Sequence, residues 1–174
     1  ECDEVDTDSL VIFSNDDADI FCGCGFVTVD NLYINATSSD PVDLSCIEAV
    51  EGYLEIENSI SESIDLSHLE EIEDELYIHE NESLLSIDLS GLETANSYIT
   101  ISSNDDLASI DLSSLETVDD QLYISSNSEL DTLVLDSLES VGSNIQFYSS
   151  SSLDEISMPS LTDVDGSIYF YYQD

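Results

Sequence analysis

Residues 122–141 read LYISSNSELDTLVLDSLESV, and this stretch decides the fold. It holds two short segments in which every second position is apolar, first Leu122 and Ile124 and then Leu133 and Leu135. Alternation with a period of two is typical of a strand with one buried face. The residues between the two segments are mainly serine, asparagine and aspartate, which favour turns. The stretch therefore predicts two short strands joined by a turn.

The same pattern recurs along the chain at spacings of 22 or 23 residues. A short strand cannot bury its apolar face alone, but stacked copies of it bury a continuous core. We therefore predict an all-β protein, a parallel β-solenoid of about eight turns of 22–23 residues each, and a rod roughly 35–40 Å long. No unit contains a 3.6-residue periodicity long enough for a regular helix. The first apolar column consists of Leu10, Leu32, Leu54, Leu76, Ile99, Leu122, Ile145 and Ile168.

The chain has 174 residues, of which 41% are hydrophobic, and this predicts a single domain with a genuine core. Within that domain we expect residues 1–30 to form an N-terminal cap and first turn, and residues 31–174 to form the repeat solenoid. The sequence contains neither a signal peptide nor a lipidation motif, so a mature, processed chain beginning at Glu1 is expected.

The pattern L-x-I-x-x-N-x-x-L from Leu122 to Leu130 resembles leucine-rich repeats. Together with the segment from Leu133 to Val141, the unit is similar to the receptor L-domain. The resemblance covers nearly the whole chain from about Leu10. It implies an extracellular β-solenoid that binds partners, and it brings no catalytic residues. The composition of this chain departs from what is usual in that family, because lysine and arginine are absent.

The charge is extreme: 41 aspartates and glutamates, two histidines, and a formal net charge of −41. Such a charge repels itself and destabilises the compact state unless external cations screen or bind it. Nucleic-acid binding is excluded as a function class, because phosphate contacts require lysine or arginine. Direct docking on anionic membranes is disfavoured for the same reason. No apolar run approaches the roughly 20 residues of a membrane-spanning helix.

The four cysteines all lie in the first third of the chain and predict a disulfide-stapled cap in an oxidising compartment. A metal site is the alternative, although there is no C-x-x-C motif and no nearby histidine. Cys2, Cys24 and Cys46 share one repeat column. Equivalent residues on neighbouring turns, or rungs, of the solenoid lie close enough to form a disulfide. We therefore favour Cys24–Cys46 with Cys2–Cys22, while three connectivities remain possible. Two sequons, at Asn35 and Asn81, are candidate glycosylation sites consistent with secretion.

Acidic residues form two outward columns, which could bind cations. Like charges about 5 Å apart repel, and no lysine interleaves them, so they require protons or cations. Carboxylates at this spacing could share Ca²⁺, whereas the alternative is a solvated face screened by diffuse cations. No cofactor is expected to be required. The candidate metal ligands are Asp43, Asp65, Asp88 and Asp111 in one column, and Glu48, Glu70, Glu93, Glu116 and Glu139 in the other.

Two further columns have competing interpretations. Asn81, Asn104 and Asn127, followed by Ser150, are interpreted as a ladder that satisfies buried backbone groups, and the alternative is a ligand site. The outward tyrosines could contact a partner or a sugar, or could simply cover the sheet. These tyrosines are Tyr33, Tyr77, Tyr123 and Tyr169.

Nothing in the chain indicates an enzyme. There is no G-x-S-x-G, phosphate loop or H-E-x-x-H motif. His68 and His79 lie among glutamates, where we expect exposed, non-catalytic roles.

The repeat stops after a single strand near residue 170, which would leave Ile168, Phe170, Tyr171 and Tyr172 available for self-assembly. Exposed strand edges recruit other strands, and a contact that does not close produces a filament. We therefore expect an extracellular or cell-surface structural protein, a solenoid subunit of a fibre, sheath or surface assembly that stacks head to tail. The alternative is a ligand-recognition module of the receptor L-domain type or a calcium-dependent adhesion module. Expected partners are other copies, another extracellular protein or a glycan.

Overall fold

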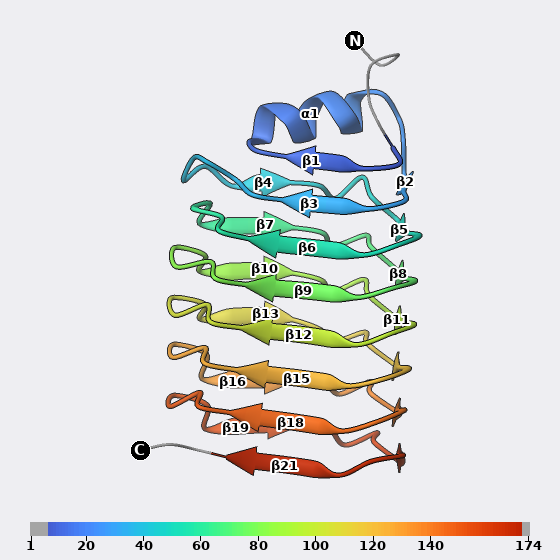
Figure 1. Cartoon of the computed structure of the whole chain (residues 1–174), viewed down its shortest axis with the longest axis vertical. Coiled ribbons are helices and arrows are strands. Elements are labelled where there is room, and N and C mark those ends of the chain that lie inside the picture. Colours follow the sequence, from blue (N-terminus) through green and yellow to red (C-terminus); the bar gives the residue numbers. More distant parts are fainter. Residues whose placement is uncertain (1–6, 172–174) are drawn as a thin grey trace.

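The computed structural model of the protein describes residues 7–171. Equivalent strands of successive turns pair in parallel and stack along one axis (Figure 1). The predicted fold class, an all-β parallel β-solenoid, is therefore confirmed. Each regular turn contains three short strands rather than the two predicted from the alternating segments.

An eight-stranded parallel sheet forms one face of the solenoid. Its strands hold the first apolar column, and each inward residue pairs with its equivalent one turn later, as Leu54 does with Leu76. The strands are β1 (Leu10–Ile12), β3 (Leu32–Ile34), β6 (Leu54–Glu57), β9 (Leu76–His79), β12 (Ile99–Ser102), β15 (Leu122–Ser125), β18 (Ile145–Tyr148) and β21 (Ile168–Tyr171).

The opposite face consists of the second predicted strand of each turn. Four of these strands form one sheet, and the last two form a separate pair. The sheet contains β4 (Val42–Asp43), β7 (Ser63–Asp65), β10 (Ser86–Asp88) and β13 (Ser109–Asp111), and the pair is β16 (Thr132–Val134) with β19 (Glu155–Ser157).

The third sheet closes one narrow side with strands of only two residues. Its inward residues, such as Val50 and Ile72, recur in the sequence at spacings of 22 or 23 residues, but two-residue strands are too short to show an alternating pattern. The strands are β2 (Thr28–Val29), β5 (Ala49–Val50), β8 (Glu71–Ile72), β11 (Thr94–Ala95), β14 (Thr117–Val118), β17 (Ser140–Val141) and β20 (Asp163–Val164).

The core is one continuous column of aliphatic side chains inside the turns. Residues such as Leu66, Leu89 and Leu112 are fully buried one above another. Stacking identical or similar side chains on each rung removes apolar surface from water at every turn, which is the main favourable contribution to folding.

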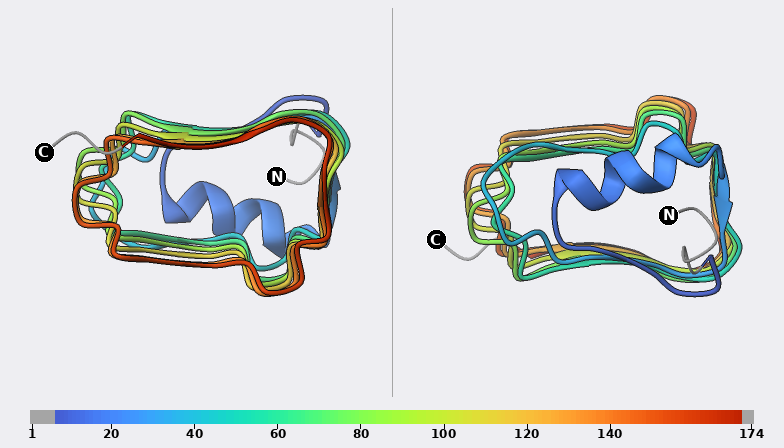
Figure 2. Two further views of the ribbon diagram at one scale, coloured as in Figure 1. Left: turned by 90° about the horizontal axis from the view of Figure 1, so that it is seen from below. Right: turned by 90° about the horizontal axis from the view of Figure 1, so that it is seen from above.

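A helix, α1 (Asn15–Gly23), occupies the first turn, and the prediction that no unit forms a regular helix was wrong there. The side chain of Ser14 accepts a hydrogen bond from the Asp17 backbone N–H, and the carboxylate of Asp17 accepts one from the backbone N–H of Phe13 at 3.0 Å. This reciprocal cap starts the helix. Ala18 and Phe21 are buried, and α1 lies across the N-terminal end of the stacked turns (Figures 1 and 2).

The disulfide pairing differs from the one favoured from the sequence. Cys22 is bonded to Cys46, with a Cα–Cα distance of 5.6 Å, so neither Cys24–Cys46 nor Cys2–Cys22 forms. Cys24 is also disulfide-bonded, whereas Cys2 lies outside the described residues. The 22-residue register was misleading because α1 replaces a strand in the first turn. A helix advances about 1.5 Å per residue and a strand about 3.3 Å, so the columns shift there.

Candidate functional site

The outer face of the eight-stranded sheet carries tyrosine side chains. Strand alternation and register confirm the predicted outward positions of Tyr33, Tyr77, Tyr123 and Tyr169, and all four side chains are half-buried. Every tyrosine within residues 7–171 lies in a strand of this sheet or directly before one. We call this set the tyrosine face; it consists of Tyr33, Tyr53, Tyr77, Tyr98, Tyr123, Tyr148, Tyr169 and Tyr171.

The rings of the tyrosine face pack against one another rather than standing apart. Tyr33 and Tyr53 meet edge to face with 4.9 Å between ring centroids. Tyr148 and Tyr171 stack on adjacent rungs at 5.0 Å. The predicted tyrosine column did not include Tyr53, Tyr98 or Tyr148, and Tyr171 was predicted only as a self-assembly residue. Tyr148 and Tyr171 lie two residues after Gln146 and Tyr169 on the same strands, so strand alternation places them on this face. Such contacts fix ring orientation and leave a regular, semi-rigid surface.

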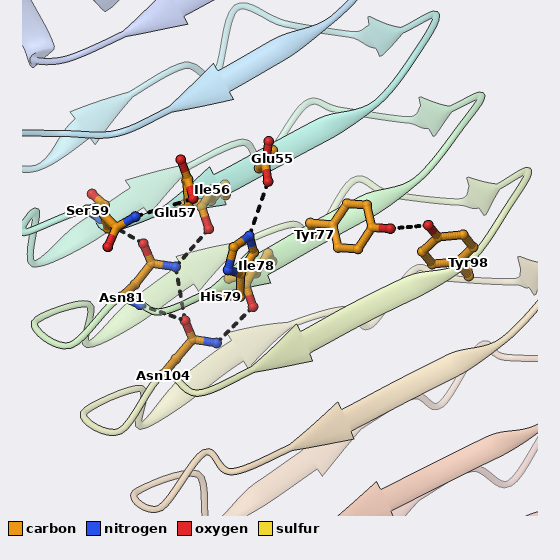
Figure 3. Close-up of polar contacts among 11 residues, drawn as sticks. Glu55, Ile56, Glu57, Ser59, Tyr77, Ile78, His79, Asn81, Tyr98 and Asn104 are labelled. Carbon is orange, nitrogen blue, oxygen red and sulfur yellow. Dashed lines mark hydrogen bonds and ion pairs between the residues drawn. The ribbon is translucent and has the colours of Figure 1, made fainter.

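Two hydroxyls of this face ionise less readily than an ordinary tyrosine. Tyr98 is hydrogen-bonded through its hydroxyl to that of Tyr77, and this bond, with burial and the charge of Glu75, raises the pKa of Tyr98 (Figure 3). Loss of hydration and the neighbouring tyrosine hydroxyls, chiefly that of Tyr171, raise the pKa of Tyr148. These two groups therefore stay neutral hydrogen-bonding groups on an otherwise acidic surface.

Glu55, Glu57 and His79 form a mixed cluster on the same face. The Nε2 atom of His79 lies 3.1 Å from Oε1 of Glu55, and one ligand atom from each of the three residues lies within 4.8 Å of the others. Figure 3 shows Glu55 and His79 joined across neighbouring strands. Within residues 7–171 this is the one group of three His, Cys, Asp or Glu side chains with that spacing. The sequence placed His79 among glutamates but did not identify this set.

The predicted aspartate ladder forms, but its carboxylates serve the local turns. Asp43 pairs with Asp65, Asp65 with Asp88, and Asp88 with Asp111. Each one accepts a hydrogen bond from the backbone N–H two residues later, at 2.9–3.0 Å. This is the Asx-turn arrangement, which the recurring Asp-x-Ser spacing could have indicated. Hydrogen bonds from the hydroxyl and N–H of Ser45 lower the pKa of Asp43.

The predicted glutamate column also forms and is exposed along its length. Backbone N–H groups bond to the equivalent carbonyl on the preceding turn, as Glu70 does to Glu48 at 2.8 Å. None of the nine predicted metal ligands belongs to a three-donor cluster within the described part of the chain. Cation sharing along the two ladders therefore stays a prediction.

The asparagine column is a buried structural ladder, as interpreted. Asn81, Asn104 and Asn127 have no exposed surface. Each side-chain amide donates to a backbone carbonyl of the preceding turn, at 2.9–3.0 Å, and the Asn81 and Asn104 amides also donate to the next asparagine (Figure 3). The prediction of glycosylation at Asn81 is therefore wrong, because a glycan on its side-chain nitrogen would break the hydrogen bonds of the ladder. Asn35 is half-buried, and its glycosylation stays a prediction.

The two ends of the solenoid differ. At the C-terminal rung Ile168, Phe170 and Tyr171 are 43%, 48% and 53% exposed. Their apolar equivalents one turn earlier, Ile145 and Phe147, are buried. Tyr172, the fourth predicted self-assembly residue, lies outside the described residues. At the other end α1 covers the core.

Comparison with protein-family models, with curated proteins and with solved structures found no match. The resemblance to receptor L-domains therefore stays a prediction. Among the described residues there is no helix with the length and apolar character needed to cross a membrane.

Proposed function

We propose that the protein is an extracellular recognition module that binds an extended, neutral glycan along the tyrosine face. The observation that carries this proposal is the collection of the described tyrosines on one flat, regular face. Aromatic rings offer apolar surface to the C–H faces of sugars, while their hydroxyls hydrogen-bond at the edge. A face rather than an enclosed pocket suits a polymer, because successive rungs repeat the same contact.

Polar residues between the tyrosines complete a surface suited to hydroxyl-rich ligands. Glu55, Thr100 and Gln146 pair with Tyr33, Tyr77 and Tyr123 on the neighbouring strands, so they occupy the same outward position on alternate rungs. Carboxylate, hydroxyl and amide groups accept or donate hydrogen bonds to sugar hydroxyls. A net charge of −41 without lysine or arginine repels anionic polymers, which leaves neutral or cationic ligands. Neutral sugars match the aromatic face, whereas a cationic ligand would bind the acidic columns as well.

An extracellular setting is supported by the cysteines. Cys22 and Cys46 are bonded to each other, Cys24 is also disulfide-bonded, and no free cysteine occurs in residues 7–171. Disulfides persist in oxidising compartments and are rare in the cytosol.

Pull-down with insoluble cellulose and chitin tests this function. In about 0.15 M NaCl the wild-type chain should bind at least one of them. The variant Tyr77→Ala/Tyr123→Ala should bind at least about tenfold more weakly, because lost ring contacts of about 1.4 kcal/mol give that factor. Leu85→Ala is the control, since Leu85 is 46% exposed but lies away from this face. Equal binding by the tyrosine variant, or binding only to a basic protein such as histone, contradicts the proposal.

A second candidate, a structural subunit, is favoured by the exposed C-terminal rung. We propose that a second copy of the chain binds to this rung through β21. The predicted head-to-tail stacking needs an open rung at both ends, but α1 covers one of them. Contact between like ends gives a closed dimer rather than a filament.

Sedimentation velocity in low and high salt tests this association. The wild type should dimerise when salt screens its charge, and Phe170→Asp should stay monomeric across the same concentrations. Phe13→Asp is the matched control, because Phe13 is 51% exposed at the opposite end and should not affect the dimer. A wild-type chain that remains monomeric at every salt and protein concentration removes this candidate.

A further inference from the structure

Strand geometry brings Glu55, Glu57 and His79 together. Residues two apart on a strand share a face, so Glu55 and Glu57 both point outward from β6. The parallel register pairs Glu57 with His79 and Glu55 with Tyr77 on the next strand, β9. The three side chains therefore start from neighbouring positions on a rigid sheet rather than from a flexible loop, which is a good foundation for a defined site.

The surroundings limit the freedom of these side chains. His79 and Glu55 are only 24% and 27% exposed, and the Tyr77 ring lies edge-on to the imidazole at a centroid distance of 6.3 Å. The side-chain amide of Asn58 donates to Oε2 of Glu57 at 3.3 Å. Partial burial strengthens electrostatic interactions relative to those of the exposed glutamate column. One side of the cluster stays open to solvent.

We propose that Glu55, Glu57 and His79 form a binding site for a single divalent transition-metal ion of the Zn²⁺ type. An imidazole nitrogen and two carboxylate oxygens are the donors that Zn²⁺ takes, with water completing a four-coordinate shell. Ligand atoms within 4.8 Å of one another need only small side-chain rotations to converge on one ion. The site stands independently of the glycan proposal, because it requires no sugar and no particular partner.

The imidazole separates this site from the acidic ladders. Ca²⁺ and Mg²⁺ prefer oxygen ligands alone, whereas an imidazole favours Zn²⁺ and its transition-metal neighbours. The competing explanation is a simple ion pair of protonated His79 with Glu55. In that pair a proton would occupy the imidazole nitrogen that the metal needs. The ion pair therefore predicts no Zn²⁺ site here, whereas the metal site predicts binding of one ion.

Calorimetric titration of the metal-free full chain with Zn²⁺ tests the proposal, in about 0.15 M NaCl with millimolar Ca²⁺ to occupy diffuse sites. We expect one tight site per chain. His79→Asn and Glu55→Gln should each weaken it at least about tenfold, since even outer partners of metal ligands contribute that factor. His68→Asn and Glu70→Gln are the matched controls and should bind as the wild type does. His68 is exposed and contacts the Ser45 carbonyl, outside any three-donor cluster of the described residues.

Imidazole NMR provides a readout that needs no variant. One equivalent of Zn²⁺ should shift the ring resonances of His79 and leave those of His68 in place. Equal shifts in both rings, no shift in either, or full displacement of Zn²⁺ by equimolar Ca²⁺ would overturn the site. Wild-type affinity in His79→Asn would do the same, provided that the metal-free variant melts as a folded protein.

Discussion

Replacing Asn104 with alanine should lower the free energy of unfolding by about 3–5 kcal/mol, a large effect for one side chain. The Asn104 amide donates to the Ile78 carbonyl at 3.0 Å and to Oδ1 of Asn127 at 3.1 Å. Its own Oδ1 accepts from the backbone N–H and the side-chain amide of Asn81, at 3.2 and 2.9 Å. Alanine leaves these buried partners without their hydrogen bonds, and each unsatisfied buried group costs about 1–3 kcal/mol.

The ladder also holds a strained turn. The residue before each ladder position has a positive φ, including Glu80 and Ser103 at 57° each. Residues other than glycine adopt this conformation at a cost of about 1–2 kcal/mol, and it persists only where the surroundings enforce it. Removing Asn104 therefore weakens the contacts that keep two adjacent turns in this conformation.

Urea unfolding followed by circular dichroism measures the effect of Asn104→Ala. The control is Asn96→Ala, which removes a half-buried amide that bonds to the carboxylates of Glu71 and Glu73 at 2.9 and 3.0 Å. Because water can replace those surface bonds, a loss of less than about 1 kcal/mol is expected there. Similar losses in the two variants would show that the buried ladder contributes no more than a surface contact.

The regular turns could be predicted because one physical rule operates in all of them. Leu122 and Ile124 alternate with polar residues, and their equivalents recur at 22 or 23 residues, so the buried face and the stacking partner were both visible. The Asn81–Asn104–Asn127 column was visible for the same reason. Repeats predict architecture well because each turn is stabilised by contacts with its immediate neighbours.

The first turn and the mixed cluster could not be predicted in the same way. Only Ala18 and Phe21 of α1 are buried, which is too few for a recognisable helical period, although Ser14 and Asp17 formed a readable cap. The helix then shifted the register on which the Cys24–Cys46 pairing depended. The cluster of Glu55, Glu57 and His79 occurs on one pair of rungs only, so no column marked it.

The stability of the whole protein should rise by about 2–4 kcal/mol when NaCl increases from about 0.01 M to about 1 M. Within the described residues the only contact between a carboxylate and a basic side chain is that of Glu55 with His79, so the carboxylates of the aspartate and glutamate columns have no ion-pair partner there. Two like charges about 5 Å apart repel by about 0.8 kcal/mol in water. The aspartate column contains three neighbouring pairs and the glutamate column four.

Screening removes most of this repulsion, because the Debye length falls from about 30 Å to about 3 Å over that range of salt. The unfolded chain retains part of its own repulsion, so the gain is smaller than the sum over the folded columns. Urea is the denaturant required, since guanidinium is itself a salt and would hide the effect. Unfolding curves at several NaCl concentrations give the slope directly, and a free energy of unfolding that does not change with salt contradicts the prediction.

A glutamine variant of the glutamate column, and a comparison with divalent cations, show which carboxylates cause the salt dependence and whether cations bind to them. Changing Glu70, Glu93 and Glu116 to glutamine removes every neighbouring charge pair in that column, and the salt dependence should fall by roughly half. MgCl₂ or CaCl₂ at matched ionic strength then separates screening from binding. If divalent cations stabilise the wild type no more than NaCl does, the ladders are a screened surface. An additional stabilisation that saturates, and that disappears in the glutamine variant, would place bound cations at the glutamate column, because only specific binding follows a saturation curve.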